Sequence, residues 1–118
     1  YIRVYSGYSL NGPLNFDSGV NSKTSNEWCH VICTFDYTNN SYKIYLNGEL
    51  KSTDTTALTK PNAFGEINIG CHKDFDFSSP YYYNFYQGEI SQVKIYNKAL
   101  TDAEVRQNFE ATRTRYGI

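Results

Sequence analysis

Two stretches within residues 26–50 alternate apolar and polar side chains, and a short polar break joins them. One face of the first stretch, EWCHVICTFDY, is uniformly apolar and should point to the core; it carries Cys29, Val31, Cys33 and Phe35. The second stretch, YKIYLNG, returns after the turn TNNS and ends at Asn47-Gly48. That pair suits a type I′ turn, because both of its central positions need a positive φ. The pattern requires an antiparallel β-hairpin.

Short runs typical of strands recur along most of the chain, with turn signals between them. We expect strands in YIRVYSGYSL, around Leu14 to Phe16, in EINIGC and in EISQVKIYN. The polar residues 51–65, KSTDTTALTKPNAFG, read as a connection between strands. Residues 72–88, HKDFDFSSPYYYNFYQG, read as a long loop rich in aromatic side chains.

The tail of the chain changes to a helical period. Thr101 and Glu104 have the spacing of a capping box, and Leu100 and Val105 can form the hydrophobic staple across it. Strands as short as those above cannot each bury a face alone, so they must be stacked as two sheets. The sequence therefore predicts an all-β fold, an antiparallel β-sandwich with a short C-terminal helix.

Size and charge exclude several classes of protein. A chain of 118 residues is long enough for one small domain, and we expect residues 1–118 to form that single domain. Its 11 basic and 12 acidic residues give a net charge of −1, which argues against a nucleic-acid partner. No apolar run is long enough for membrane insertion. The chain has no Met and starts inside a strand-like run, so we expect it to be the C-terminal segment of a longer chain.

The three cysteines read as buried thiols. Cys29 and Cys33 lie four residues apart in a strand, which separates their Cα atoms by about 13 Å, too far for a disulfide. Cys71 can pair with one of them only if strands bring the two together. Free thiols fit folding in a reducing cytoplasm. A zinc site is disfavoured, because each neighbouring histidine, His30 or His72, faces away from its cysteine in a strand.

Several linked blocks of the sequence resemble a known family. EWCHVICTFD, YKIYLNGEL, EINIG and FYQGEISQVKIYNKALTDAEV resemble, in this order, the concanavalin A-like jelly roll of the laminin G-like family. The resemblance covers residues 26 to about 110 and implies a jelly-roll sandwich. The positions that match are Trp28, His30, Val31, Thr34, Asp36, Asn47, Gly48, Ile69, Gly70, Gly88, Ile90, Val93, Ile95, Tyr96, Ala99, Leu100 and Glu104.

The last residues, QNFEATRTRYGI, carry a shorter resemblance. They are similar to the C-termini of laminin G-like domains in virion proteins of large tailed bacteriophages. The resemblance implies a virion structural protein, such as a fibre, spike or capsid decoration protein, assembled in the host cytoplasm and oligomeric within a larger assembly. The matching positions are Asn108, Phe109, Ala111, Arg113, Arg115, Tyr116, Gly117 and Ile118.

An enzyme is not expected from this chain. Glucanases on the same scaffold use a strand pattern E-x-D-x-x-E, which holds two carboxylates a few ångströms apart. The nearest match is EISQVK, where Glu89 is present but Ser91 and Lys94 replace the other two carboxylates. A lone glutamate cannot run the two-carboxylate mechanism. The sequence also contains neither a G-x-S-x-G nor an H-E-x-x-H motif.

The aromatic stretch favours binding over catalysis. Tyrosine can stack on a sugar face while its hydroxyl finds a polar partner. We expect a non-catalytic carbohydrate-binding or adhesion module whose partner is a host-surface glycan. The alternative is a purely structural domain, whose loop packs against other virion subunits. The expected glycan contacts are Tyr81, Tyr82, Tyr83, Asn84, Tyr86 and Asp76.

Calcium is the one cofactor for which the sequence offers ligands. The resemblance implies it, because laminin G-like domains often hold one calcium ion at the rim of the sandwich. Calcium prefers carboxylate oxygens from loops. The candidates are Asp17, Asp74 and Asp76, and the alternative is a solvated acidic loop.

Overall fold

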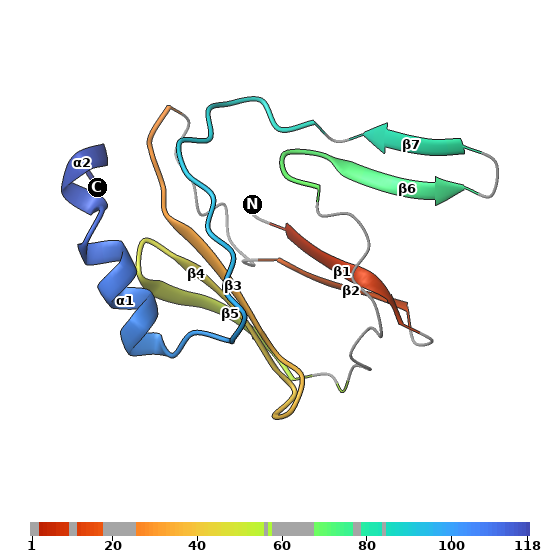
Figure 1. The fold of residues 1–118 in the computed structure, drawn as a ribbon, viewed down its shortest axis with the longest axis horizontal. Helices are drawn as coiled ribbons and strands as arrows, with labels where there is room; N and C mark the ends of the chain where they lie inside the picture. Colours follow the sequence, from red (N-terminus) through yellow and green to blue (C-terminus); the bar gives the residue numbers. More distant parts are fainter. Residues whose placement is uncertain are drawn as a thin grey trace. The chain divides into compact units, whose positions relative to one another are not determined.

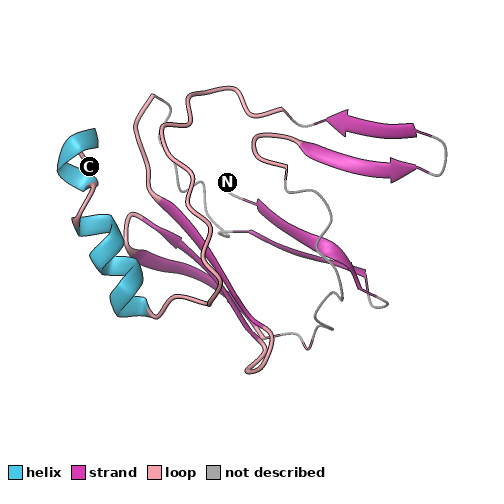
Figure 2. Cartoon of the chain, in the orientation of Figure 1, coloured by secondary structure: helices cyan, strands magenta, loops and turns pink. Residues whose placement is uncertain are grey.

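The fold consists mainly of antiparallel strands followed by a helical C-terminal segment (Figures 1 and 2). The computed structural model divides the chain into two compact units. Unit 1 comprises Tyr1–Pro61 and Tyr96–Ile118, and unit 2 comprises Asn62–Ile95. The residues that the structure describes are 3–9, 12–17, 26–55, 57, 68–76, 79–83 and 85–118.

A three-stranded sheet forms the centre of unit 1. It consists of β3 (Val31–Asp36), β4 (Ser41–Leu46) and β5 (Glu49–Asp54), with β4 in the middle and antiparallel to both neighbours. The hairpin predicted from the alternating stretches is confirmed as β3–β4. The prediction that residues 51–65 form a connection between strands is wrong at its start, because residues 51–54 belong to β5. Main-chain pairing with β4 holds β5, whose side chains are mostly polar and exposed.

Both turns of this sheet are closed by short polar side chains. In the β3–β4 turn the Asp36 carboxylate accepts hydrogen bonds from the backbone N–H groups of Thr38 and Asn39, at 3.0 and 3.1 Å. In the β4–β5 turn Asn47 and Gly48 have φ values of 50° and 77°, both positive as the type I′ turn requires. The Asn47 Oδ1 accepts from the backbone N–H of His30 at 2.9 Å, while the Asn47 N–H donates to the His30 carbonyl at 2.8 Å. The pair His30 and Asn47 therefore extends the hydrogen-bonded pairing of β3 and β4 by one residue on each side.

One face of the sheet carries an apolar cluster. Tyr42 and Ile44 are completely buried, and Cys33, Phe35 and Tyr37 pack against them. The predicted core face of the first stretch is thus confirmed at Cys33 and Phe35. It is wrong at Val31, which is 39 % exposed where β3 begins.

The opposite face is buried by helix α1 (Asp102–Glu110), which Figure 1 draws alongside the sheet. Tyr45, Leu100 and Val105 form one buried cluster there, and Ile32 packs against it. The sheet is therefore covered on two sides, although the sequence pattern predicts only one core face. The contacts that bury this face join residues far apart in the sequence, since α1 follows β4 by more than fifty residues.

The predicted capping box is confirmed at the start of α1. Thr101 Oγ1 accepts a hydrogen bond from the Glu104 N–H at 3.3 Å, and Glu104 Oε2 accepts one from the Thr101 N–H at 2.9 Å. These bonds satisfy two main-chain donors at the helix terminus. A short helix, α2 (Arg113–Tyr116), follows α1. Within the described residues, no helix combines the length and apolar character needed to cross a membrane.

A separate hairpin lies at the start of unit 1. Strand β1 (Arg3–Ser9) pairs antiparallel with β2 (Gly12–Asp17), and their register shifts between Ser6 and Tyr8. Both strands are confirmed predictions.

Unit 2 departs from the prediction at three places. Strands β6 (His72–Asp76) and β7 (Ser79–Tyr83) form an antiparallel hairpin where a loop is predicted. Residues 89–97, predicted as a strand, run without strand pairing in the described structure, and so do residues 68–71 of EINIGC. The first two residues of EINIGC lie outside the described residues. Alternating side chains permit a strand, but only a neighbouring strand supplies its hydrogen bonds.

The all-β class is supported by these sheets. They contain two, three and two strands, all antiparallel, within the described part of the chain. The face-to-face stacking of two sheets into a sandwich, and the single domain over residues 1–118, stay predictions.

Gly48→Ala is expected to destabilise unit 1. A Cβ at this position would lie 2.8 Å from Cδ1 of Phe109, and its φ of +77° adds strain to any L side chain. We expect the free energy of unfolding to fall by about 1–3 kcal/mol in a denaturant titration. The matched control is Gly117→Ala, whose φ is +69° but whose Cβ would meet nothing within 4 Å. Equal losses in the two variants would contradict a packing role for the Gly48–Phe109 contact.

Candidate functional site

Exposed aromatic side chains gather at the end of the β6–β7 hairpin and in the residues that follow it. Tyr82, Phe85 and Tyr86 are 41, 67 and 46 % exposed, and Tyr83 is half-buried. We call Tyr82, Phe85 and Tyr86 the aromatic edge. Of the other expected glycan contacts, Tyr81 pairs with Asp74 and Asp76 pairs with Ser79 in the hairpin register, while Asn84 lies outside the described residues.

Two glycines position the ring of Tyr86. The Tyr86 N–H donates to the carbonyl of Gly70 at 2.6 Å, and Gly70 has a φ of +81°. The ring itself covers Gly88, where an added Cβ would lie 2.7 Å from Tyr86 Cζ. Any side chain at residue 88 would therefore push the ring away. The bond to Gly70 positions the main chain at Tyr86, Gly88 leaves room for the ring, and nearly half of the residue is exposed.

The aromatic edge can stack on flat apolar groups of a ligand. A tyrosine or phenylalanine ring offers a large apolar face, and a tyrosine hydroxyl adds a hydrogen-bonding tip. Sequence reasoning found these residues from their density in the chain alone. It missed the hairpin that carries them, because β6 and β7 contain charged residues, a proline and a serine, which are typical of loops.

The predicted calcium ligands lie on two different units. Asp17 ends β2 and pairs with Arg3 in unit 1, whereas Asp74 and Asp76 occupy alternate positions of β6 in unit 2. In the described parts of the chain, no three His, Cys, Asp or Glu residues cluster as a metal site would require. The calcium site stays a prediction.

The cysteines and Glu89 offer no assembled catalytic group. Cys29, Cys33 and Cys71 are free thiols, which confirms that Cys29 and Cys33 do not pair with each other. Burial raises the pKa of the Cys33 thiol to about 11, so it is protonated and unreactive near neutral pH. Glu89 is exposed, as are Ser91 and Lys94, which stand where a glucanase would carry its other carboxylates.

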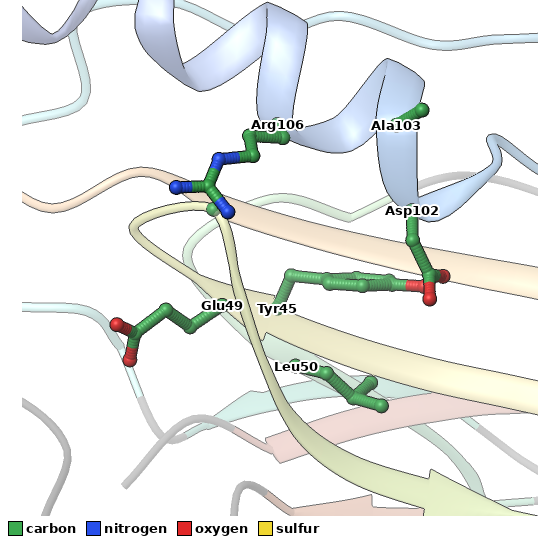
Figure 3. A pocket seen from close by; sticks show the side chains of 7 residues that line it. Tyr45, Glu49, Leu50, Asp102, Ala103 and Arg106 are labelled. Carbon is green, nitrogen blue, oxygen red and sulfur yellow. The ribbon is translucent and has the colours of Figure 1, made fainter.

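An open depression lies between the β4–β5 turn and α1, with a volume of about 440 Å³ (Figure 3). The Tyr45 hydroxyl donates to Asp102 Oδ1 at 2.5 Å, and Lys43 Nζ lies 2.9 Å from the same oxygen. Figure 3 shows Glu49 and Arg106 at the opposite end of the Tyr45 ring from Asp102. Sequence reasoning missed this place, since its two sides are more than fifty residues apart.

The carboxylate of Asp102, the ammonium of Lys43 and the hydroxyl of Tyr45 stabilise one another. Hydrogen bonds from Tyr45 and then Lys43 hold the pKa of Asp102 below its usual value, and the bond to Asp102 raises the pKa of Lys43. Burial, followed by the bond to Asp102, raises the pKa of Tyr45. The Tyr45 ring is only 2 % exposed, so it cannot stack on a ligand. The cluster therefore fastens the start of α1 to the sheet rather than forming a binding face.

Two comparisons with known proteins add to this geometry. A laminin G-type family model, described as "Concanavalin A-like lectin/glucanases superfamily", matches residues 1–106. The 2.1 Å crystal structure of an S-layer domain-containing protein (residues 221–444) from Clostridium thermocellum ATCC 27405 is similar, with 29 % identity and a TM-score of 0.60. The match covers 88 % of this chain and 48 % of that one, so this chain spans about half the length of that structure. No curated protein matches the chain.

Asp102→Asn should weaken the fold at neutral pH. The lowered pKa of Asp102 means that its charged form stabilises the folded state above its ordinary pKa of 3.8, and that this contribution is lost as pH falls below 3.8. Because the side chain is 67 % exposed, we expect a loss of at most about 1 kcal/mol at pH 7. Denaturant titrations at pH 7 and pH 3 should show the gap between wild type and variant narrowing at the lower pH. A gap that is unchanged at pH 3, or one that Glu27→Gln also produces, would argue against the interaction.

Cys33 should resist alkylation. In a Cys29→Ala/Cys71→Ala variant, iodoacetamide should modify Cys33 slowly at pH 8, and the rate should keep rising toward pH 11, since the thiolate is the reactive form. Mass spectrometry of timed samples measures the rate, and the denatured variant gives the reference. A folded rate equal to the denatured rate would show that burial does not suppress the thiolate.

Proposed function

The chain belongs to the concanavalin A-like lectin/glucanase superfamily, and on this premise we propose that it is a non-catalytic carbohydrate-binding module that acts at a biological surface. The observation that carries the proposal is the aromatic edge, three aromatic residues that are each more than 40 % exposed within five positions of the chain. Large aromatic side chains are usually buried, and a group of exposed ones marks a place of contact.

Recognition would proceed by stacking and polar contact. The rings of Tyr82, Phe85 and Tyr86 would cover the apolar face of a sugar, while the two tyrosine hydroxyls hydrogen-bond to its hydroxyl groups. The position of the Tyr86 ring over Gly88 supports this proposal, because a ring that already packs on the chain loses less conformational freedom on binding. Tyr81, Tyr83, Asn84 and Asp76 complete the proposed contact set.

The superfamily name covers both lectins and glucanases, and we favour the lectin side. Glycoside hydrolysis needs two carboxyl groups on either side of the scissile bond. The segment that would carry them holds Glu89 alone, with Ser91 and Lys94 in the other two places. The proposed architecture is the jelly-roll sandwich, in which stacked sheets form a rigid platform and the segments at its end do the binding.

A surface location is supported by the similar crystal structure. That protein is named as S-layer domain-containing, and the present chain shares 29 % of its residues over the matched part. We propose a surface role of the same broad kind. The C-terminal sequence QNFEATRTRYGI leads us to place it on a virion, as part of a fibre, spike or decoration protein that binds a host-surface glycan.

A structural role is the second candidate function. Exposed side chains on residues 85–95, including Ile90 and Val93 at 51 % each and Ile95 at 71 %, extend the apolar surface beyond the aromatic edge. A surface of this kind also suits permanent packing against other subunits of a particle. In that case the aromatic edge would be covered in the assembly and would not meet a glycan.

A glycan array tests the proposal. The triple variant Tyr82→Ala/Phe85→Ala/Tyr86→Ala should lose binding that the wild type shows, and Tyr82→Phe should retain most of it because the ring remains. The matched control is Ile95→Ala, which removes an apolar side chain outside the aromatic edge that is 71 % exposed, more than any residue of the edge. A parallel array with EDTA tests the calcium ligands Asp17, Asp74 and Asp76. If the folded wild type binds no glycan, or the triple variant binds like wild type, the aromatic edge is not a lectin site.

A further inference from the structure

A second aromatic surface lies on unit 1, where the segment leading into β3 meets α2. The ring of Trp28 lies 5.3 Å from that of Tyr116, at an interplanar angle of 49°. The guanidinium carbon of Arg115 lies 5.6 Å from the centre of the Tyr116 ring. Trp28 is 38 % exposed and Arg115 is also exposed. We call Trp28, Arg115 and Tyr116 the cationic platform.

The turn that carries the platform is held in one conformation by backbone bonds. The Arg115 N–H donates to the Thr112 carbonyl at 3.1 Å, and Thr112 Oγ1 donates to the Asn108 carbonyl at 3.0 Å. Gly117 then closes α2 in the left-handed conformation, and its N–H donates to the Arg113 carbonyl. An indole, a phenol and a guanidinium that already lie together in the free protein reduce the ordering that binding requires.

The C-terminal segment is positively charged, although the chain as a whole carries −1 and the exposed Glu27 directly precedes Trp28. From residue 106 onward the charged side chains are Arg106, Arg113 and Arg115 against Glu110. Glu110 already pairs with Arg113 at 3.0 Å. The ion pairs found in the described part of the chain use Lys43, Lys51, Lys98 and Arg113, which leaves Arg115 with its contact to the Tyr116 ring.

We infer that the cationic platform binds an acidic sugar residue, whose ring stacks on Trp28 and whose carboxylate or phosphate group pairs with Arg115. An indole offers the widest apolar face of any side chain, and a guanidinium matches the geometry of a carboxylate or phosphate. Residues 107–118 also lie beyond the part of the chain that the family model matches. The platform therefore joins Trp28, which lies within the part that the family model matches, to two residues that lie beyond it.

An acidic saccharide suits this surface better than a nucleic acid. A nucleic-acid site needs an extended basic groove to follow the phosphates, whereas the platform offers a single guanidinium on a chain with more acids than bases. The inference extends the proposed carbohydrate-binding function to a second surface on a different unit from the aromatic edge. The two surfaces can therefore be tested independently.

Trp28 is the single tryptophan of the chain, so its fluorescence reports directly on the platform. The probes are tetragalacturonic acid, its fully methyl-esterified form, a mannose 6-phosphate oligosaccharide and an oligothymidylate of similar length. We expect an acidic saccharide to change the Trp28 emission saturably. The neutral ester should bind about tenfold more weakly or worse, because it loses the charge-assisted hydrogen bond. A preference between the carboxylate and phosphate probes would identify the acidic group.

Arg115→Gln should weaken binding of the acidic probe by about tenfold while leaving the circular dichroism spectrum unchanged. The matched control is Arg106→Gln, which removes the same charge from α1 beside the depression and should bind like wild type. The inference is overturned if ester and acid bind equally, if Arg115→Gln binds like wild type, if Arg106→Gln weakens binding equally, if the oligothymidylate binds more tightly than both saccharides, or if no probe changes the Trp28 emission.

The same titration separates this inference from the proposed function. The variant Tyr82→Ala/Phe85→Ala/Tyr86→Ala should keep the Trp28 response to the acidic probe. If the aromatic edge fails on the glycan array while this response persists, the proposed lectin site is wrong and the cationic platform stands. If glycans bind at the aromatic edge and Trp28 stays silent, the platform is wrong and the lectin site stands.

Discussion

Burial of β4 on both of its faces is the constraint on which unit 1 depends. Tyr42 and Ile44 point into one apolar cluster, and Tyr45, between them and the turn, belongs to the other. A central strand with hydrogen bonds to both neighbours and apolar contacts on both sides has no solvent-facing side left. Strand β5 can consequently be polar, because main-chain pairing with β4 holds it, and α1 can be short, because it has to cover only one face of β4. The turn at Asn47-Gly48 sets the geometry that lets Phe109 approach the backbone.

Local patterns predicted the parts of this fold that depend on neighbouring residues. The β3–β4 hairpin, the Asn47-Gly48 turn and the capping box at Thr101 and Glu104 all follow from short-range chemistry. Predictions that depend on a partner distant in the sequence were wrong at several places. The sequence does not predict β5 as a strand, because its side chains are mostly polar and its hydrogen-bonding partner is β4. Residues 89–97 alternate as a strand does, but alternation does not supply a neighbour to pair with.

The candidate sites show the same division. The aromatic edge was visible as a density of tyrosine and phenylalanine, yet the exposure of Tyr82 and the position of the Tyr86 ring belong to the three-dimensional structure. The Tyr45–Asp102 contact joins residues 57 positions apart, and the cationic platform joins Trp28 to a turn near residue 116. Spacing in the sequence carries no signal for either. The two proposed surfaces share aromatic rings that lie partly in solvent, next to main-chain segments joined by backbone hydrogen bonds.

The contact between Tyr45 and Asp102 has a consequence for the order of folding. Hairpin β3–β4 closes a loop of a few residues and can form within microseconds of becoming free to fold, whereas docking of α1 must close a loop of 57 residues. During synthesis from the N-terminal end, the face that carries Ile32 and Tyr45 therefore waits without its helix until residues 102–110 have emerged. An apolar sheet face without its cover is a template for aggregation. Docking of α1 is thus the late folding step that covers this apolar face and removes the aggregation-prone surface of the nascent sheet.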